Sequence, residues 1–382
     1  MPAPVASVVW DERFCDYDFG PGHPFSERSR ALAAHLLARL APPNGGPIRW
    51  VDDVRVGSRA LLETFHRPEY LAQIEGASVD PTPSLLDAGD TPAFPGCYDA
   101  AARLVAGADR ALALALEHSR PAFHPAGGLH HAYPDRASGF CIFNDVAIAV
   151  ERAAREHARV AYIDIDAHHG DGVMYGFYDS GRVLDIDFHQ DGRTLFPGTG
   201  FPAESGRGDG AGLKVNVPLP PGAGDEVLLP LFRRIVPPLL RKFRPEVIIL
   251  QHGIDGHAGD ALAQLQYTPT AYTEIDRTLI ALALELAHGR LLVTGGGGYR
   301  PASVSRVLAR TGALLAGLPP PTDVDPLPPE WRDEYRRSLG QAAPLSWSEP
   351  PPVHPYSWSP DRESELVREL ETATGERFPA PG

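Results

Sequence analysis

The sequence has few cysteines and no long apolar run. Its three cysteines, Cys15, Cys97 and Cys141, cannot all pair and lack metal-ligand spacing, so the expected compartment is a reducing cytoplasm. No apolar run approaches the roughly 18 residues that cross a bilayer, which excludes a membrane-spanning protein. The N-terminus has no basic segment followed by an apolar one, and acidic residues begin at Asp11, too early for a signal peptide.

Basic residues are too few to balance the acidic ones. The chain of 382 residues has 35 Lys and Arg against 49 Asp and Glu, a formal net charge of −14. Such a surface repels phosphate backbones and anionic lipids, so we expect neither nucleic acid nor membrane as a partner. Hydrophobic residues make up 43% of the chain, which excludes a fully disordered protein.

Short apolar runs alternate with longer amphipathic ones. Residues 27–40 and 99–118 have apolar positions three and four apart and predict helices. Runs of strand length lie at residues 5–10, 159–166, 182–188, 246–251 and 290–294. This alternation predicts an α/β fold in which helices wrap a parallel sheet.

The composition changes at Leu318. Residues 319–382 hold 14 prolines. This segment also contains two short helical stretches and three tryptophans, at about 329–338 and 361–372 and at Trp331, Trp347 and Trp358. Because exposed indoles gain much by burial, we expect a main domain over 1–318 and a C-terminal extension, 319–382, packed on its core. The alternative is a disordered tail.

Residue types that carry chemistry gather where the expected strands end, which is where ligands bind in open parallel sheets. His130 and His131 lie in the glycine-rich segment GGLHHA. In such a loop both rings can converge on one pocket, where a nearby carboxylate would make them general acids or bases. The alternative is a pair of surface histidines.

The segment YIDIDAHHGDG, residues 162–172, is the densest in metal-ligand types. On a strand, Asp164, Asp166 and His168 would share one face, and three polar groups there are costly unless they bind something. Carboxylate and imidazole suit Zn²⁺ or Fe²⁺, and Asp255, after the strand at 246–251, could complete an open shell of catalytic type. The alternative is a structural or Ca²⁺-like turn.

Three further features are weaker. Four glycines precede Tyr299 without the lysine of a phosphate loop, so the run would serve to present the phenol as an oxyanion donor. Phe140 and Phe196 each lie in a glycine-containing loop. The favoured interpretation is that both are core residues, and the alternative is that they form a slot for an alkyl chain. For His252 and His257 the favoured interpretation is a hydrogen bond that holds a loop.

Taken together, these segments resemble the histone deacetylase superfamily, which has the arginase–deacetylase fold. The resemblance extends over about residues 1–316 and rests on GGLHHA (127–132), SGFCIFND (138–145), YIDIDAHHGDG (162–172), FPGTG (196–200), HGIDGHAGD (252–260) and GGGGY (295–299). Any one of these is weak, but six in order are highly specific. The segments YDFGPGHP, QHGIDGH and LPPEWRDEY look most like the bacterial acetoin-utilisation branch.

The resemblance implies a three-layer α/β/α sandwich with an eight-stranded, mainly parallel sheet. It implies Zn²⁺, or Fe²⁺, on Asp166, His168 and Asp255. It implies a catalytic set formed by His130 with Asp164, His131 with Asp171, and Tyr299. It places substrate contacts at Asp90, Gly139, Phe140 and Phe196.

The resemblance also implies structural K⁺ or Na⁺ ions. The inner site would use backbone carbonyls of Asp164, Asp166, His168 and Phe188, with Asp187 where the common pattern has a hydroxyl. The outer site would involve Phe177, Ser180 and Val183.

The function implied is zinc-dependent hydrolysis of N-ε-acetyl-lysine in proteins, for instance in an acetylated metabolic enzyme such as acetyl-CoA synthetase. One alternative is an amidohydrolase of small acetylated amines such as acetylpolyamines. Another is an inactive acetyl-lysine-binding module, which the intact set of site residues disfavours. The sequence leaves open the oligomeric state and which histidine is base and which is acid.

Overall fold

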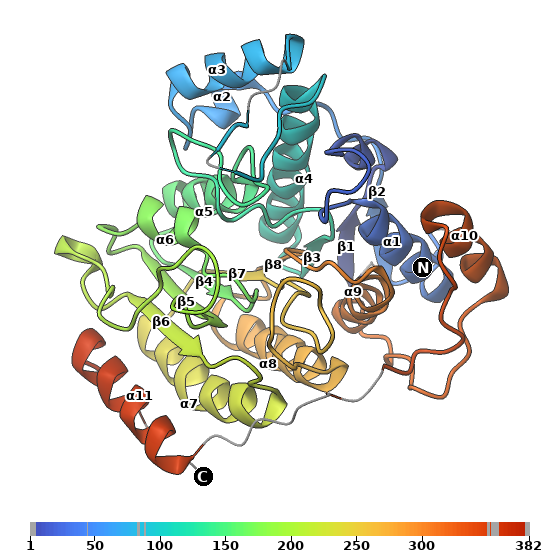
Figure 1. Cartoon of the computed structure of the whole chain (residues 1–382). Helices are drawn as coiled ribbons and strands as arrows, with labels where there is room; N and C mark the ends of the chain where they lie inside the picture. The colour runs from blue at the N-terminus through green and yellow to red at the C-terminus, as the bar shows by residue number, and fades with distance from the viewer. Residues whose placement is uncertain are drawn as a thin grey trace.

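A computed structural model of the chain describes residues 5–43, 45–81, 85–87, 89–349, 352 and 359–378. Within these residues, eight parallel strands form one sheet in the order β2–β1–β3–β8–β7–β4–β5–β6 (Figure 1). The strands are β1 (Ala6–Val9), β2 (Ile48–Val51), β3 (Ala122–His124), β4 (Val160–Asp164), β5 (Val183–Gln190), β6 (Lys214–Leu219), β7 (Val247–Gln251) and β8 (Leu291–Thr294). The predicted parallel sheet is confirmed.

Helices cover both faces of the sheet, so the predicted α/β/α sandwich is also confirmed (Figure 1). Helices α4 (Cys97–His118) and α5 (Asp145–Glu156) pack on one face, and α1 (Arg28–Leu40), α7 (Asp225–Phe243), α8 (Pro269–Leu286) and α9 (Pro301–Leu315) cover the other. The remaining helices are α2 (Arg59–Leu62), α3 (Pro68–Val79), α6 (Asp171–Gly176), α10 (Pro329–Leu339) and α11 (Pro360–Thr374), with 3₁₀ turns at Glu12–Asp16 and Gly208–Gly210. None of the helices in the described ranges combines the length and apolarity that a bilayer crossing needs.

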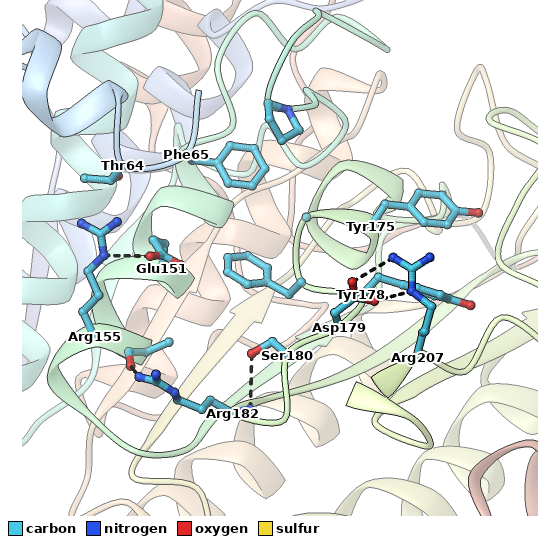
Figure 2. A pocket seen from close by; sticks show the side chains of 14 residues that line it. Thr64, Phe65, Glu151, Arg155, Tyr175, Tyr178, Asp179, Ser180, Arg182 and Arg207 are labelled. Atoms are coloured by element: carbon cyan, nitrogen blue, oxygen red, sulfur yellow. Dashed lines mark hydrogen bonds and ion pairs between the residues drawn. The ribbon is translucent and has the colours of Figure 1, made fainter. Parts of the chain in front are cut away.

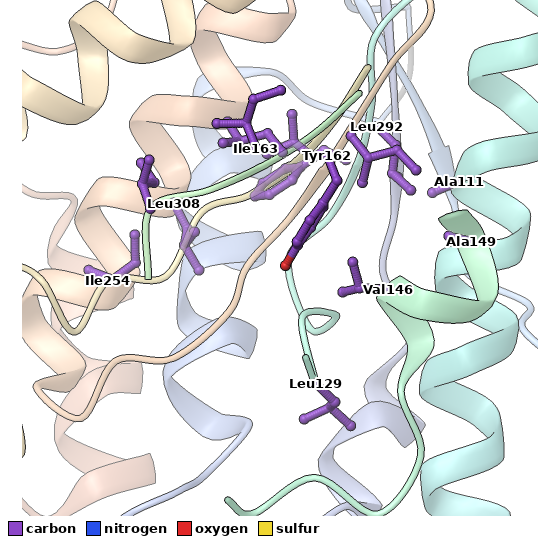
Figure 3. Packing of buried hydrophobic residues seen from close by; sticks show 14 of the residues in the cluster. Ala111, Leu129, Val146, Ala149, Tyr162, Ile163, Ile254, Leu292 and Leu308 are labelled. Atoms are coloured by element: carbon purple, nitrogen blue, oxygen red, sulfur yellow. The ribbon is translucent and has the colours of Figure 1, made fainter. Parts of the chain in front are cut away.

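The core lies between the central strands and the helices. Both faces of β7 and β4 are buried, which is why the sequence there reads as continuous apolar runs. Figure 3 shows Tyr162 of β4 and Leu292 of β8 beside Ala111 of α4 and Val146 of α5. The hydroxyl of Tyr162 is polar, and it donates to Oδ2 of Asp164 at the carboxyl end of β4.

The strands that sequence reasoning missed are β2, β3 and β6. In β2 the exposed Arg49 interrupts the apolar residues, and β3 has three residues, too few for a periodic signal. β6 carries Lys214 and Asn216 in buried positions, so its sequence lacks an apolar run. Polar residues inside a sheet are compensated only by tertiary partners, which a single strand does not reveal.

The described part of the C-terminal extension lies against the main domain. Helix α10 packs on α1, and the indole N–H of Trp331 donates to the carbonyl of Leu32 at 2.8 Å. Trp347 is buried, and the nearby Glu349 forms a buried ion pair with Arg306 of α9 at 2.7 Å. Trp358 lies outside the described residues. Helix α11 packs along β6 at the edge of the sheet (Figure 1).

Trp331→Ala is expected to lower the free energy of unfolding by about 3–5 kcal/mol, because it empties a fully buried site and leaves the Leu32 carbonyl without its donor. Urea denaturation of the full chain measures this. Leu345→Ala is the matched control, since Leu345 belongs to the same extension and is exposed, and its effect should stay within about 0.5 kcal/mol. If both substitutions changed the free energy of unfolding by the same small amount, the extension would not stabilise the main domain through Trp331.

Candidate active site

Three metal-ligand side chains meet at the carboxyl ends of two neighbouring strands. β4 and β7 pair in parallel, with Asp164 opposite Gln251. Asp166 and His168 lie in the loop after β4, and Asp255 lies in the loop after β7. One ligand atom from each of these three buried side chains lies within 4.8 Å of the others. The expectation that Asp166 and His168 share a strand face with Asp164 is wrong, since β4 ends at Asp164 and the loop brings the ligands together.

The donor set fits a divalent cation. Nδ1 of His168 lies 2.9 Å from Oδ2 of Asp255 and 3.3 Å from Oδ1 of Asp166. Burial and repulsion by the negative charge of Asp166 raise the pKa of Asp255 to about 7, and a cation between the two carboxyl groups would remove that repulsion. Ligand sets of this kind with an open position are typical of catalytic zinc sites.

Backbone donors fix the ligand carboxylates in place. The Ala167 N–H donates to Oδ1 of Asp255 and the Gly297 N–H donates to Oδ2 of Asp166, both at 2.8 Å. A Cβ at position 297 would lie 2.2 Å from Oδ2 of Asp255, so this member of the glycine run lets the backbone approach the ligands. The glycine run therefore has a role beyond the presentation of Tyr299.

The two adjacent histidines converge, as the glycine-rich loop predicted. Nδ1 of His130 lies 2.8 Å from Oδ2 of Asp164, and Nδ1 of His131 lies 2.7 Å from Oδ1 of Asp171. The two Nε2 atoms are 3.0 Å apart. The side-chain amide of Asn144 donates to the carbonyl of His130 and so holds the loop in this shape.

The Nε2 contact has room for one proton, so one ring donates and the other accepts. Burial lowers the pKa of His130, but the carboxylates of Asp164 and Asp166 outweigh burial and raise this pKa to about 10. Burial and the neighbouring charge of His130 lower the pKa of His131 to about 4. At neutral pH the pair therefore holds a charged His130 and a neutral His131.

Aromatic rings stand around the histidines and the metal ligands. The Tyr299 ring lies 5.9 Å from Phe140 and 6.5 Å from His168, and its backbone N–H donates to Asp260 at 2.8 Å. Burial raises the pKa of Tyr299, which keeps its hydroxyl a neutral donor. Phe196 is 44% exposed, with its ring 5.1 Å from His131. The interpretation of Phe196 as a core residue is therefore wrong.

Phe140 is held in a strained conformation. Its φ of 65° lies in the left-handed region, which residues with a Cβ seldom adopt. Its N–H donates to Oγ1 of Thr91 at 3.0 Å, and its carbonyl accepts from the Tyr17 hydroxyl at 2.6 Å. A Cβ at Gly139 would lie 2.9 Å from the Phe196 ring, so Gly139 brings the two loops close together.

Asp90 lies at the outer side of these rings. Its carbonyl faces Nε2 of His23 at 3.0 Å, and the His23 ring lies 4.7 Å from Phe140. The side chain of Asp90 is exposed. Partial burial of its carboxyl group, and next the neighbouring Asp87, raise the pKa of Asp90 to about 6. Asp90 is therefore connected to Phe140 through the ring of His23.

The inner monovalent site stays a prediction. The Asp187 carboxylate accepts from the Gly170 N–H at 2.7 Å and faces Nδ1 of His189 at 2.6 Å. A Cβ at Gly170 would lie 2.6 Å from a carboxylate oxygen of Asp164 and 3.2 Å from one of Asp187. The buried carboxylates of Asp164 and Asp187 thus both lie next to Gly170, and two negative charges so close together suit a cation.

Sequence reasoning missed several residues that orient the site. The Tyr162 hydroxyl donates to Asp164 at 2.5 Å, and the Tyr133 hydroxyl donates to Asp171 at 2.9 Å. Tyr162 could have been found, because it precedes Asp164 by two residues and shares its strand face. Tyr133 and Asp260 carry no such signal, since their contacts depend on how separate loops meet.

His252 and His257 each make the kind of hydrogen bond that the sequence predicted for them. Nε2 of His252 lies 2.9 Å from Asp276, and Nδ1 of His257 lies 2.8 Å from the carbonyl of Ala258. These contacts hold loops, and neither residue belongs to the group of three candidate metal ligands found among the described side chains.

Comparison with known proteins agrees with this architecture. Residues 23–315 match the histone deacetylase domain. The acetoin utilization protein AcuC of Bacillus subtilis (strain 168) is 36% identical over 358 residues, which cover 91% of this chain and 90% of that protein. AcuC of Staphylococcus xylosus is 32% identical, with 90% of this chain and 91% of that protein covered. The crystal structure of the HDA15 HD domain superposes with a TM-score of 0.74 at 27% identity and covers 83% of this chain and 91% of that one.

An eight-stranded parallel sheet with its polar cluster at the strand ends thus defines the arginase–deacetylase fold. The chain belongs to the histone deacetylase family, whose members are hydrolases that act on amides. Within this family it is AcuC-like.

Proposed function

We propose that this chain is a zinc-dependent deacetylase that hydrolyses the amide of N-ε-acetyl-lysine in proteins. The observation that carries the proposal is the adjacency of a buried Asp–His–Asp ligand set, a histidine pair and the aromatic rings of Phe140, Phe196 and Tyr299. The AcuC relatives favour a substrate protein from metabolism, such as acetylated acetyl-CoA synthetase. This extends the family assignment to a particular metal and substrate.

Asp166, His168 and Asp255 would hold the metal ion. The chemistry that Zn²⁺ supplies when bound is polarisation of the amide carbonyl and a lower pKa for a bound water. The backbone donors at Ala167 and Gly297 keep the carboxylates oriented, as the outer partners of metal ligands do.

The neutral His131 accepts the proton of the attacking water at Nε2. Asp171 accepts the hydrogen bond from Nδ1–H and so fixes the tautomer in which Nε2 is free. The charged His130, paired with Asp164, donates a proton toward the leaving amine, directly or through His131. The assignment of base to His131 and acid to His130 rests on their opposite pKa shifts, raised for His130 beside Asp164 and lowered for His131 beside His130.

Tyr299 donates its hydroxyl to the oxyanion of the tetrahedral intermediate, an interaction that is stronger in the transition state than in the bound amide. Phe140 and Phe196 line the slot for the lysine methylenes and exclude water from it. Asp90 accepts hydrogen bonds from the backbone N–H groups of a peptide.

The second candidate substrate class is small acetylated amines, because a net charge of −14 attracts any cation. Asp90 separates the two classes, since an acetylpolyamine has no peptide backbone. Asp90→Ala is expected to lower kcat/KM on an acetyl-lysine peptide by about 10- to 100-fold and to leave hydrolysis of N-acetylputrescine unchanged.

The measurement is release of acetate from each substrate alone and from the two in competition, with Asp52→Ala, an exposed carboxylate elsewhere, as the matched control. The wild type should prefer the peptide. A preference for N-acetylputrescine, with Asp90→Ala without effect on either substrate, would overturn the protein-lysine assignment and leave the amide hydrolase intact.

A further inference from the structure

The turn between α6 and β5 presents backbone carbonyls to the interior. It runs from Phe177 to Val183, the residues to which the family resemblance assigns an outer monovalent cation. Carbonyl oxygens gathered in this way replace the hydration shell of an ion such as K⁺. They serve an ammonium group equally well, because both are monovalent cations that carbonyl oxygens stabilise.

A lysine side chain reaches these carbonyls. Nζ of Lys214, the first residue of β6, donates to the carbonyl of Val183 at 2.7 Å and faces the carbonyl of Ser180 at 3.4 Å. The side chain of Lys214 is fully buried. The chain has two lysines, and the other, Lys242, lies on the surface with its ammonium paired to Glu376. One of the two lysines is therefore placed where this residue type is seldom found.

The charge of Lys214 has a buried counterpart. Asp185 of β5 lies opposite Lys214 in the parallel register, so the two side chains share one face of the sheet. Neither carboxylate oxygen of Asp185 has a hydrogen-bond partner among the described residues. Two residues further along the same face is Asp187, behind the candidate active site. Burial and the charge of Asp187 raise the pKa of Asp185, and burial lowers the pKa of Lys214 to about 8, so at neutral pH Lys214 is still the cationic group beside these buried carboxyl groups.

We infer that the ammonium group of Lys214 takes the place of the outer monovalent cation, so that the Phe177–Val183 turn binds no ion from solution. The residues do not fit a metal ion there, because Nζ already occupies hydrogen-bonding positions on the Val183 and Ser180 carbonyls. The cation of this site is thus covalently part of the chain and does not depend on the salt around the protein.

The turn can be reached from solvent, which makes the inference testable. Phe177 and Ser180 line a surface cavity of about 610 Å³. Figure 2 shows Ser180 in its wall, beside Asp179 and Arg182, and two of the dashed lines mark the ion pair between Asp179 and Arg207. Phe177 and Ser180 belong to the part of the turn that this cavity exposes, while Val183 and Lys214 lie outside its lining.

Thallous ion, an anomalous scatterer of about the size of K⁺, is the crystallographic probe. Crystals of the wild-type full chain grown in thallous acetate should show no anomalous peak within about 3 Å of the Val183 and Ser180 carbonyls. Crystals of Lys214→Ala should show one. A peak there in the wild type would overturn the inference even if the variant failed to fold, and its absence from folded Lys214→Ala would do so too.

Thermal unfolding gives a second readout that is independent of catalysis. In choline chloride, Lys214→Ala should unfold about 5 °C below the wild type, because Asp185 loses the neighbouring positive charge. KCl at equal ionic strength should reduce this difference in unfolding temperature, because K⁺ can bind the variant. Lys214→Met, whose side chain fills the space without a charge, should show a gap that KCl leaves unchanged. The surface control Lys242→Ala should follow the wild type in both salts.

The wild type and the three variants all keep the inner site. An effect of K⁺ there would therefore change their unfolding temperatures equally and would not change the differences between them. An equal response of wild type and Lys214→Ala to K⁺ would contradict the inference, as would rescue of Lys214→Met by KCl.

Discussion

Asp255→Asn is expected to abolish stoichiometric metal binding and to lower kcat/KM for an acetylated peptide by at least about 10³-fold. Asparagine keeps an oxygen that can accept the hydrogen bond from the Ala167 N–H, so the loop after β7 should retain its shape. What the substitution removes is one of the two negative charges that the ligand set directs at the metal. The loss of activity then reports on the metal and not on folding.

Metal content of the purified variant, measured by elemental analysis, and its kinetics on the same peptide test this expectation. Asp276→Asn is the matched control, because Asp276 is an equally buried carboxylate that pairs with His252 and Thr311. The control should bind one metal ion per chain. If Asp255→Asn kept both its metal and its turnover, Asp255 would not be a ligand.

Tyr299→Phe is expected to lower kcat by about 10²–10³-fold while the metal stays bound and KM changes little. The substitution removes the hydroxyl and leaves the ring, whose contacts with Phe140 and His168 shape the slot. Because the hydroxyl interacts mainly with charge that develops in the transition state, the loss should appear in kcat.

Steady-state kinetics and metal analysis on the same preparation separate this role from a structural one. Tyr272→Phe serves as the control, since Tyr272 is a fully buried tyrosine whose hydroxyl has no hydrogen-bond partner among the described residues. It should keep wild-type kcat. Unchanged turnover in Tyr299→Phe would remove this residue from the mechanism.

The parallel sheet could be predicted because its central strands are buried on both faces and read as apolar runs. Residues 246–251 and 290–294 coincide with β7 and β8 to within one residue. The same reasoning failed for β6, where Lys214 and Asn216 interrupt the apolar pattern. Buried polar residues are stabilised by partners distant in sequence, and no local pattern contains them.

The candidate site could be predicted in part for a related reason. Asp166, His168 and Asp255 follow strands, and parallel strands end at one edge of the sheet, so their proximity follows from the fold. The donors that orient the site, such as Tyr133 and Asp260, come from loops whose shape depends on the whole structure. The proposed role of the Lys214 ammonium group in place of an ion could not be predicted from the sequence either, because it depends on the register between β5 and β6.

The most direct test of the account is release of acetate from an acetyl-lysine peptide by the purified, zinc-loaded chain, before and after chelation. We expect steady release that stops when the metal is removed and returns when Zn²⁺ is restored. Metal-loaded protein that releases no acetate from the peptide would contradict protein-lysine deacetylation, and release that survives complete removal of metal would contradict the role given to Asp166, His168 and Asp255.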